Sequence, residues 1–160
     1  LGMIAFCFAI VVGISFGIVS ALTRKRWVNS LITVFATIGV SVPGFLLAML
    51  MMVLFAVKLG WFSIIGLDHW TSYIMPVLAL SFSPISSITR LTRSSLRDVM
   101  GSDYITLARS KGTKEIWVIV KHGLKNALLP VITYAGPMFA GMITGSLVIE
   151  TLSSVIFGIE

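Results

Sequence analysis

The segment Arg90–Pro130, RLTRSSLRDVMGSDYITLARSKGTKEIWVIVKHGLKNALLP, decides how this chain is organised, because uncharged apolar runs lie on both sides of it. It holds eight of the twelve Lys and Arg residues of the chain. Together with Asp98, Asp103 and Glu115 they give the segment a net charge of +5, out of +6 for all 160 residues. The rest of the sequence is nearly neutral and mostly apolar.

The composition excludes an ordinary soluble domain. The mean hydropathy is +1.02 and only 11% of the residues are charged, which is typical of a protein that lies in a membrane. The chain begins at Leu1 rather than at an initiator Met and stops at Glu160 without a polar tail. We expect a piece of a longer protein, incomplete at both ends, so any number of spans is a minimum.

Four uncharged runs are candidates for membrane-spanning helices. The first, from Met3 to Leu22, has twenty residues. At helical rise that length reaches roughly 30 Å, the thickness of the hydrocarbon layer. A signal peptide is the alternative, but the run is too long and no basic segment precedes it. We therefore expect an all-α membrane protein with spans at about 3–22, 28–57, 72–89 and 126–149.

Glycine and proline mark the expected bends and close-packing faces of these helices. Gly13 and Gly17 form a G-x-x-x-G pair, a pattern that lets a neighbouring backbone approach closely. The same pattern recurs in the fourth run, and a Pro-Gly pair in the middle of the second predicts a kink or hinge. The residues expected to act as hinge or packing positions are Pro43, Gly44, Gly141 and Gly145.

The third run is less hydrophobic than the others, with two prolines and a cluster of serines. A helix this polar should face protein or water rather than lipid. Two interpretations stay open: the helix borders a translocation path, or it packs against other helices through small residues. The serines are Ser81, Ser83, Ser86 and Ser87.

The distribution of positive charge predicts the orientation. The segments Arg24–Arg26 and Arg90–Lys125 hold eleven Lys and Arg residues, whereas Lys58 is the only one on the other side. Loops rich in Lys and Arg stay in the cytoplasm. We expect residues 90–125 to form a cytoplasmic loop, and both ends of the chain to lie outside.

Inside this loop the sequence predicts a short helix. Gly101 interrupts what precedes it, and Ser102 or Asp103 can cap a helix over residues 104–111. Gly112 marks its end, since glycine is the usual residue just after a helix C-terminus.

A second helix should follow after the glycine. Thr113 can cap it, Glu115 lies in its first turn, and it can run through Trp117 and His122 back toward the membrane. The predicted order in the loop is helix, glycine corner, helix.

The short helix has one partly apolar face. Tyr104, Leu107, Ala108 and Lys111 fall on it at i, i+3, i+4 and i+7. One interpretation is a basic amphipathic helix on anionic lipid, which would need a longer apolar face and no abrupt end. The stop at Gly112 favours docking into a groove of a cytoplasmic protein.

Two stretches of the loop carry a family resemblance: DYITLARSKG at Asp103–Gly112 and KHGLKNALLP at Lys121–Pro130. They resemble the "EAA" loop of ABC importer permeases, most closely the B-type membrane subunit of the dipeptide/oligopeptide/nickel group. Ser41–Phe45 and Val148–Thr151 are similar to further motifs of that group. The sequence departs from the pattern after Glu150, where the usual Pro-Gly is absent.

The resemblance implies a type I ABC importer permease-like helical bundle. It implies that the chain is not an enzyme, since it lacks a G-x-x-x-x-G-K-S/T stretch and ATP and Mg would be bound by partner subunits. It also implies a coupling helix that contacts the ATPase. The residues expected to make that contact are Asp103, Tyr104, Ala108, Arg109, Lys111 and Gly112.

The partners implied are two ABC ATPase subunits, a second permease subunit, an extracytoplasmic substrate-binding protein and the lipid bilayer of a bacterial or archaeal cytoplasmic membrane, with no nucleic acid. Peptide, nickel and glutathione importers of the group share the loop, and peptide is favoured as the substrate on family breadth alone.

Asp68 and His69 are adjacent in the sequence, but without further donor residues they predict a solvated loop and no metal site.

Two functions from other classes remain as alternatives. One is an ATP-independent carrier or channel, and the other is a membrane anchor whose basic loop recruits lipid or a partner. Ion-coupled carriers place ionisable residues inside their spans. The four apolar runs contain none, and Glu150 lies at the outer end of the last.

Overall fold

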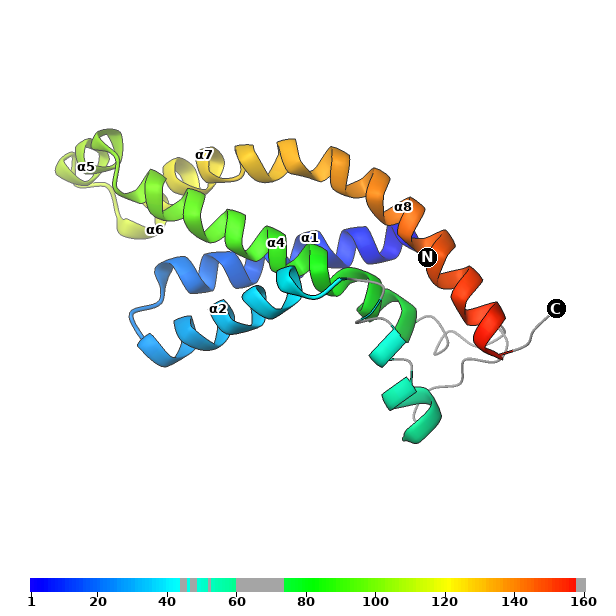
Figure 1. The fold of residues 1–160 in the computed structure, drawn as a ribbon. Coiled ribbons are helices and arrows are strands. Elements are labelled where there is room, and N and C mark those ends of the chain that lie inside the picture. The colour runs from blue at the N-terminus through cyan, green and yellow to red at the C-terminus, as the bar shows by residue number, and fades with distance from the viewer. Residues whose placement is uncertain (44–45, 47–48, 52, 60–73, 158–160) are drawn as a thin grey trace.

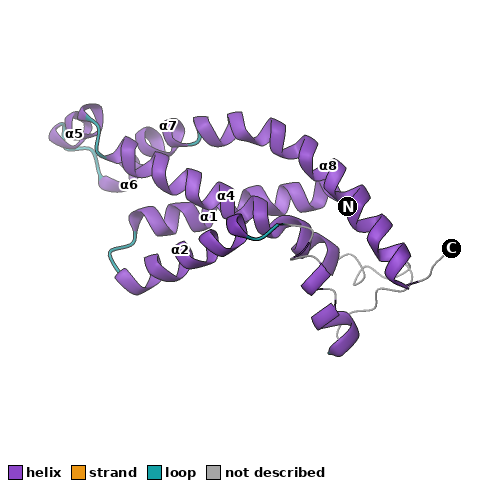
Figure 2. Cartoon of the chain, in the orientation of Figure 1, coloured by secondary structure: helices purple, strands orange, loops and turns teal. Residues whose placement is uncertain are grey.

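The computed structural model describes residues 1–43, 46, 49–51, 53–59 and 74–157. Over these residues the chain is helical and contains no strand, as expected for an all-α protein (Figure 2). The described elements are α1 (Gly2–Leu22), α2 (Arg26–Ser41), the π-helix η1 (Val53–Lys58), α4 (Ile74–Met100), α5 (Asp103–Ser110), α6 (Glu115–Trp117), the π-helix η3 (Val118–Leu124), α7 (Lys125–Ala127) and α8 (Leu129–Phe157).

The first two apolar runs form helices near their predicted bounds. α1 covers the first run, and α2 ends at Ser41, where the break in the second run was expected. The next residue, Val42, is extended, which suits a residue that precedes Pro43. Gly44, the other half of the predicted hinge, lies outside the described residues.

The third helix does not stop at the predicted border between span and loop at residue 90. α4 continues to Met100, and the amide of Gly101 still bonds to the carbonyl of Arg97 at 3.1 Å. Arginine is a good helix former, so the charges of this segment extend the helix instead of ending it. At 27 residues α4 is roughly 40 Å long, so its basic end reaches beyond a hydrocarbon layer of about 30 Å.

By length and composition, the described residues include one helix that could cross a membrane by itself, Gly2–Leu22. A second is added if Glu115–Ala127 and Leu129–Gly145, which meet at an angle of 43°, form one broken span. The count of four spans therefore stays a prediction.

The centre of the molecule is the contact between α1 and α4, which cross at close range (Figure 1). The buried face of α1 is made of small residues. A Cβ added at Gly13 would lie 2.7 Å from Ile88 Cβ, and one at Gly17 would lie 2.4 Å from Thr92 Cβ. These distances leave no room for a side chain, so the G-x-x-x-G pair has the role predicted for it. The small residues buried on α1 are Gly2, Ala5, Ala9, Gly13, Gly17 and Ser20.

The hydroxyl residues of α4 divide between two surroundings. Ser81, Ser86 and Thr89 are buried, and the Thr89 hydroxyl donates to the Gly13 carbonyl at 3.3 Å. For these residues the packing interpretation is correct. Ser87 instead lines a cavity of about 440 Å³, together with Arg90 and with residues of α2 and α8.

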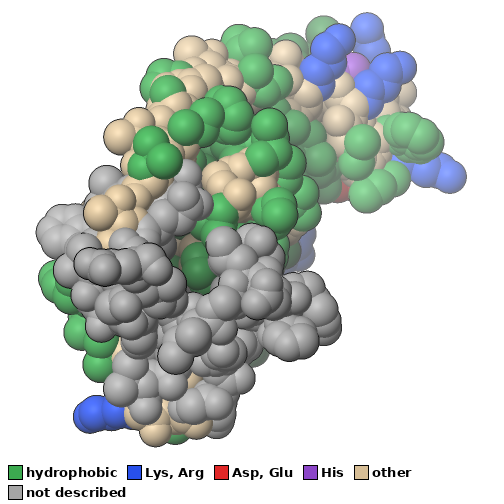
Figure 3. Space-filling view, turned by 90° about the vertical axis from the view of Figure 1, so that its right-hand side faces the viewer, with side chains coloured by type: hydrophobic (Ala, Val, Ile, Leu, Met, Phe, Trp, Pro, Cys, Tyr) green, Lys and Arg blue, Asp and Glu red, His purple; other side chains and the backbone are tan. Residues whose placement is uncertain are grey.

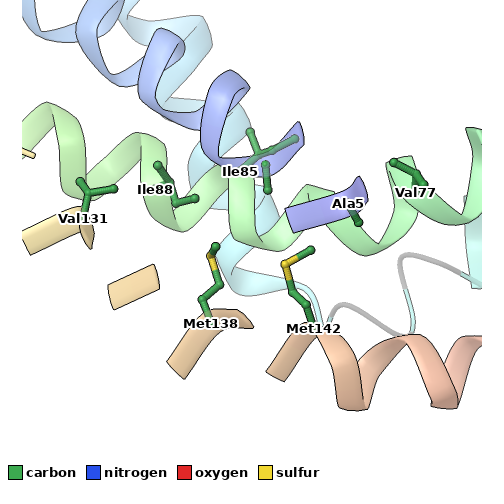
Figure 4. Packing of buried hydrophobic residues seen from close by; sticks show 8 residues of the cluster. Ala5, Val77, Ile85, Ile88, Val131, Met138 and Met142 are labelled. Carbon is green, nitrogen blue, oxygen red and sulfur yellow. The ribbon is translucent and has the colours of Figure 1, made fainter. Parts of the chain in front are cut away.

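A hydrophobic cluster joins α1, α4 and α8 (Figure 4). Met138 and Met142 point from α8 toward α4, where Ile85 and Ile88 lie. An edge-to-face pair of aromatic rings, Phe6 and Phe139, adds to the contact between α1 and α8, with centroids 4.8 Å apart. The core therefore sits on the inner faces of these three helices.

Candidate functional site

Both basic segments lie at the same end of the helices. There the link between α1 and α2 comes close to the corner between α5 and α6 (Figure 1). The space-filling view shows Lys and Arg side chains gathered at that end, while much of the remaining described surface in view is hydrophobic (Figure 3). The predicted placement of both segments on one side of the membrane requires this arrangement.

α5 forms the predicted short helix, and its C-terminus is a Schellman motif. The amide of Thr113 bonds to the carbonyl of Ala108 at 3.4 Å, and the amide of Gly112 bonds to that of Arg109 at 2.9 Å. Gly112 has φ +78°, the left-handed conformation that glycine adopts without steric cost. The glycine corner predicted from the sequence is confirmed.

The predicted N-terminal caps are wrong in detail. Ser102 is the residue before α5, but its hydroxyl donates to the Val99 carbonyl at 2.6 Å and makes no capping bond to the new helix. The next helix begins after Lys114 rather than Thr113, again without a side-chain cap. The Ser102 and Thr113 hydroxyls therefore cap neither α5 nor α6. Tertiary contacts must hold α5 in place.

Ile105 is fully buried on the inner side of α5, and α5 packs against η3. The opposite side of α5 is open, with Tyr104 42% exposed and Leu107 56% exposed. Ala108 is half-buried and Lys111 is exposed on the same face. Most of the face predicted to bind a partner is thus exposed, and Leu107 is its more exposed large apolar side chain.

Arg109 has a partner that sequence reasoning missed. Its guanidinium donates twice to Glu115, at 3.1 Å from Nε and 2.7 Å from Nη2. The hydrogen bonds from Arg109 lower the pKa of Glu115, and the same bonds raise the pKa of Arg109. The pair spans the Gly112 corner, and both side chains are about half exposed, so it ties α5 to α6 without a deep desolvation cost.

A second tie joins α5 to the helix that returns toward α8. Asn126 Nδ2 donates to the Tyr104 hydroxyl at 3.1 Å and to the His122 carbonyl at 3.2 Å. Twenty-two residues separate Tyr104 from Asn126, so no helical spacing could have indicated the pair. Tyr104 therefore has two roles: its ring contributes to the exposed face, and its hydroxyl fixes α5 in place.

The segment that returns from the α5–α6 corner to α8 is bent. η3 is a π-helix, a form often found at functional sites, and it lies between α6 and α7. The axis turns by 43° where α7 meets α8, beside Pro130. A Cβ at Gly123 would lie 3.0 Å from Met100 Sδ, so this segment packs tightly on the end of α4.

The structure gives the surroundings of three of the predicted hinge and packing residues of the spans, Pro43, Gly141 and Gly145. Gly145 lies close to α4, since a Cβ there would be 3.3 Å from Leu80 Cδ1. Gly141 has no atom of the described residues within 4 Å of the position of such a Cβ, so its role as a packing position stays a prediction. Pro43 follows the end of α2, and its role as a hinge stays a prediction.

The six predicted contact residues do not share one surface. Tyr104, Ala108 and Lys111 lie on the exposed face, Arg109 is turned to Glu115, and Gly112 forms the corner. Asp103 is exposed in the first turn of α5. The described residues hold no group of three or more His, Cys, Asp or Glu side chains that could bind a metal ion.

Comparison with known proteins gives matches over most of the chain. Residues 13–156 match the family described as "Binding-protein-dependent transport system inner membrane component". The glutathione transport system permease protein GsiC of Salmonella paratyphi A and of Salmonella typhimurium is 44% identical over 142 residues, and that of Escherichia coli is 42% identical. The aligned residues make up 89% of this chain and 46% of each relative, so the chain spans about half the length of these curated relatives.

Proposed function

The chain belongs to the family of inner membrane components of binding-protein-dependent transport systems, and we propose that it is part of a permease subunit of an ATP-driven importer. The subunit transports and does not catalyse. α5 is its coupling helix, and the Asp103–Gly112 segment is the contact with a separate ATPase.

The observation that carries this proposal is the geometry of α5. The helix is short, ends at a fixed corner, buries Ile105 on one side and leaves Leu107 exposed on the other. An exposed apolar face on a rigidly held helix suits docking into a groove on another protein. It suits adsorption to lipid less well, because only two turns are available.

The attachments of α5 supply a path for movement. The Arg109–Glu115 ion pair connects it to α6, and the bond between Tyr104 and Asn126 connects it to α7 and so to the start of α8. A displacement of α5 by the ATPase would therefore move α6, η3, α7 and α8 together. Alternating access follows if this movement selects between two arrangements of the spans.

We extend the proposal to the membrane and the partners. The chain contributes four spans to a multi-pass protein of the bacterial inner membrane, with the basic end in the cytoplasm. A second permease subunit, two ATPase subunits and an extracytoplasmic binding protein complete the transporter. The substrate is a peptide-type molecule, supported by relatives named for glutathione transport. The cavity beside Ser87 and Arg90, which has both polar and apolar walls, suits a border of the translocation path.

A charge placed on the exposed face of α5 tests the coupling role. We expect Leu107→Asp to reduce substrate-stimulated ATP hydrolysis and uptake by at least about tenfold, since an exposed apolar anchor would be replaced by a charge in the contact. The measurement is uptake and ATPase activity of the full-length protein in its transporter, reconstituted in vesicles.

The matched control is Thr106→Asp, the same charge on the same helix but off the docking face. It should keep activity within about twofold, as a surface substitution away from the contact does. Membrane insertion and co-purification of the ATPase are measured for both variants. Full activity of Leu107→Asp would contradict the coupling role, and a wild-type protein that never co-purifies with an ATPase would favour an ATP-independent carrier.

A further inference from the structure

A basic cavity lies beside the α5–α6 corner and is not explained by docking of α5. Its volume is about 450 Å³, and it is an open cavity lined by the end of α1 with Arg24, the last turns of α4, the corner itself and Ile119 of η3. Residues of four separate segments therefore line one space. Those used below are Leu22, Arg24, Arg97, Met100, Arg109 and Glu115.

The charge of the cavity suits an anion. Three of its lining residues are arginines and one is a glutamate. Arg109 is held by Glu115 through two hydrogen bonds, so these two charges compensate each other. Arg24 and Arg97 remain, and among the described residues no acidic side chain other than Glu115 lines the cavity. Guanidinium groups bind phosphate with paired donors, which makes a phosphate group the expected ligand.

The position of the cavity relative to the membrane favours a lipid over a free anion as its ligand. Leu22 is the last residue of α1, the helix that is long and apolar enough to cross a membrane, so its level is where the hydrocarbon layer ends. The arginines follow directly at headgroup level, and Leu22 and Met100 supply an apolar wall. Basic pockets between helices on the cytoplasmic side suit lipid headgroups. A free phosphate would leave the apolar wall unused.

We propose that this cavity binds the headgroup phosphate of an anionic phospholipid between Arg24 and Arg97. A lipid there would contact the end of α1, the end of α4 and the α5–α6 corner at once. Binding would stabilise the position of α5 relative to the two helices that form the centre of the molecule. Anionic lipid would then regulate how firmly the coupling segment is held, whatever protein docks on its outer face.

The test uses the full-length protein in detergent with added phosphatidylglycerol, phosphatidylcholine or inorganic phosphate. Bound lipid is measured by native mass spectrometry and stability by the thermal unfolding midpoint. We expect saturable binding and stabilisation by phosphatidylglycerol alone. In Arg24→Gln/Arg97→Gln the apparent affinity should fall roughly thirtyfold, given the contribution of each basic residue to anionic lipid binding.

The matched control is Lys25→Gln/Arg26→Gln, which removes the same charge from the same basic segment but outside the cavity lining. It should change the affinity by less than about threefold. Arg24→Lys/Arg97→Lys keeps the charge and should recover part of the binding, which distinguishes loss of the site from loss of folding. An equal loss in the control pair, equal stabilisation by inorganic phosphate, or no effect of phosphatidylglycerol would each overturn the proposal.

Discussion

The contact between α1 and α4 and the corner between α5 and α6 both depend on glycine, but for different physical reasons. At Gly17 the limit is space, since a Cβ would lie 2.4 Å from Thr92 Cβ. At Gly112 the limit is the backbone, with φ +78° and no atom within 4 Å of the position of a Cβ. Where a neighbour requires the glycine, the effect of a substitution depends on the size of the new side chain. Where the backbone φ requires it, the effect depends on how well the new residue adopts a positive φ.

Substitution of Gly17 should have the largest effect. Gly17→Ala forces Thr92 and the α4 backbone away, and we expect a loss of about 1–3 kcal/mol in stability. The thermal unfolding midpoint of the full-length protein in detergent measures it. The control is Gly141→Ala, the same change in the same G-x-x-x-G pattern, which should be neutral or gain up to about 1 kcal/mol from helix propensity. A lower midpoint for Gly141→Ala than for Gly17→Ala would reverse the assignment of the packed face.

Substitution of Gly112 should cost less and depend on residue type. Gly112→Ala should cost about 1 kcal/mol locally, whereas Gly112→Asn should cost less because asparagine tolerates the left-handed region. Amide hydrogen exchange at Ala108–Thr113 measures the opening of the corner, and ATP hydrolysis coupled to transport should fall in the same order. Equal exchange in the two variants would show that φ does not govern the corner.

The smallest effect concerns the ion pair that spans the corner. Arg109 lowers the pKa of Glu115 below its ordinary value of 4.5, so the folded state binds this proton less tightly than the unfolded state. The stabilisation is present above pH 4.5 and is lost as the pH falls through the lowered pKa. It is small, because both groups are exposed.

Glu115→Gln should therefore speed amide exchange at the corner at pH 7 and leave it unchanged well below pH 4. The reversed pair Arg109→Glu/Glu115→Arg should restore protection if the attraction itself matters. Identical exchange of Glu115→Gln and the wild type at pH 7 would mean that the pair contributes nothing to the corner.

Several features followed from the sequence because their causes are local. The short helix and its corner depend on residues 103–113, where glycine and the hydrogen-bonding pattern lie within a few residues of each other. The length of α1 and the small-residue face with Gly13 and Gly17 are equally local. The helix α4 continues through the predicted border at residue 90 to Met100, because a change from apolar to basic residues marks a change of surroundings rather than the end of a helix. The border between span and loop itself stays a prediction.

Only the tertiary structure decided which of the available surfaces are used. The same G-x-x-x-G pattern packs both glycines on α1, whereas Gly141 on α8 meets no neighbour among the described residues. The pairing of Arg109 with Glu115 and of Tyr104 with Asn126 crosses a corner and a bend, where helical periodicity carries no information. The sequence determines which helix faces can pack closely. The tertiary structure determines which of these faces meet another helix.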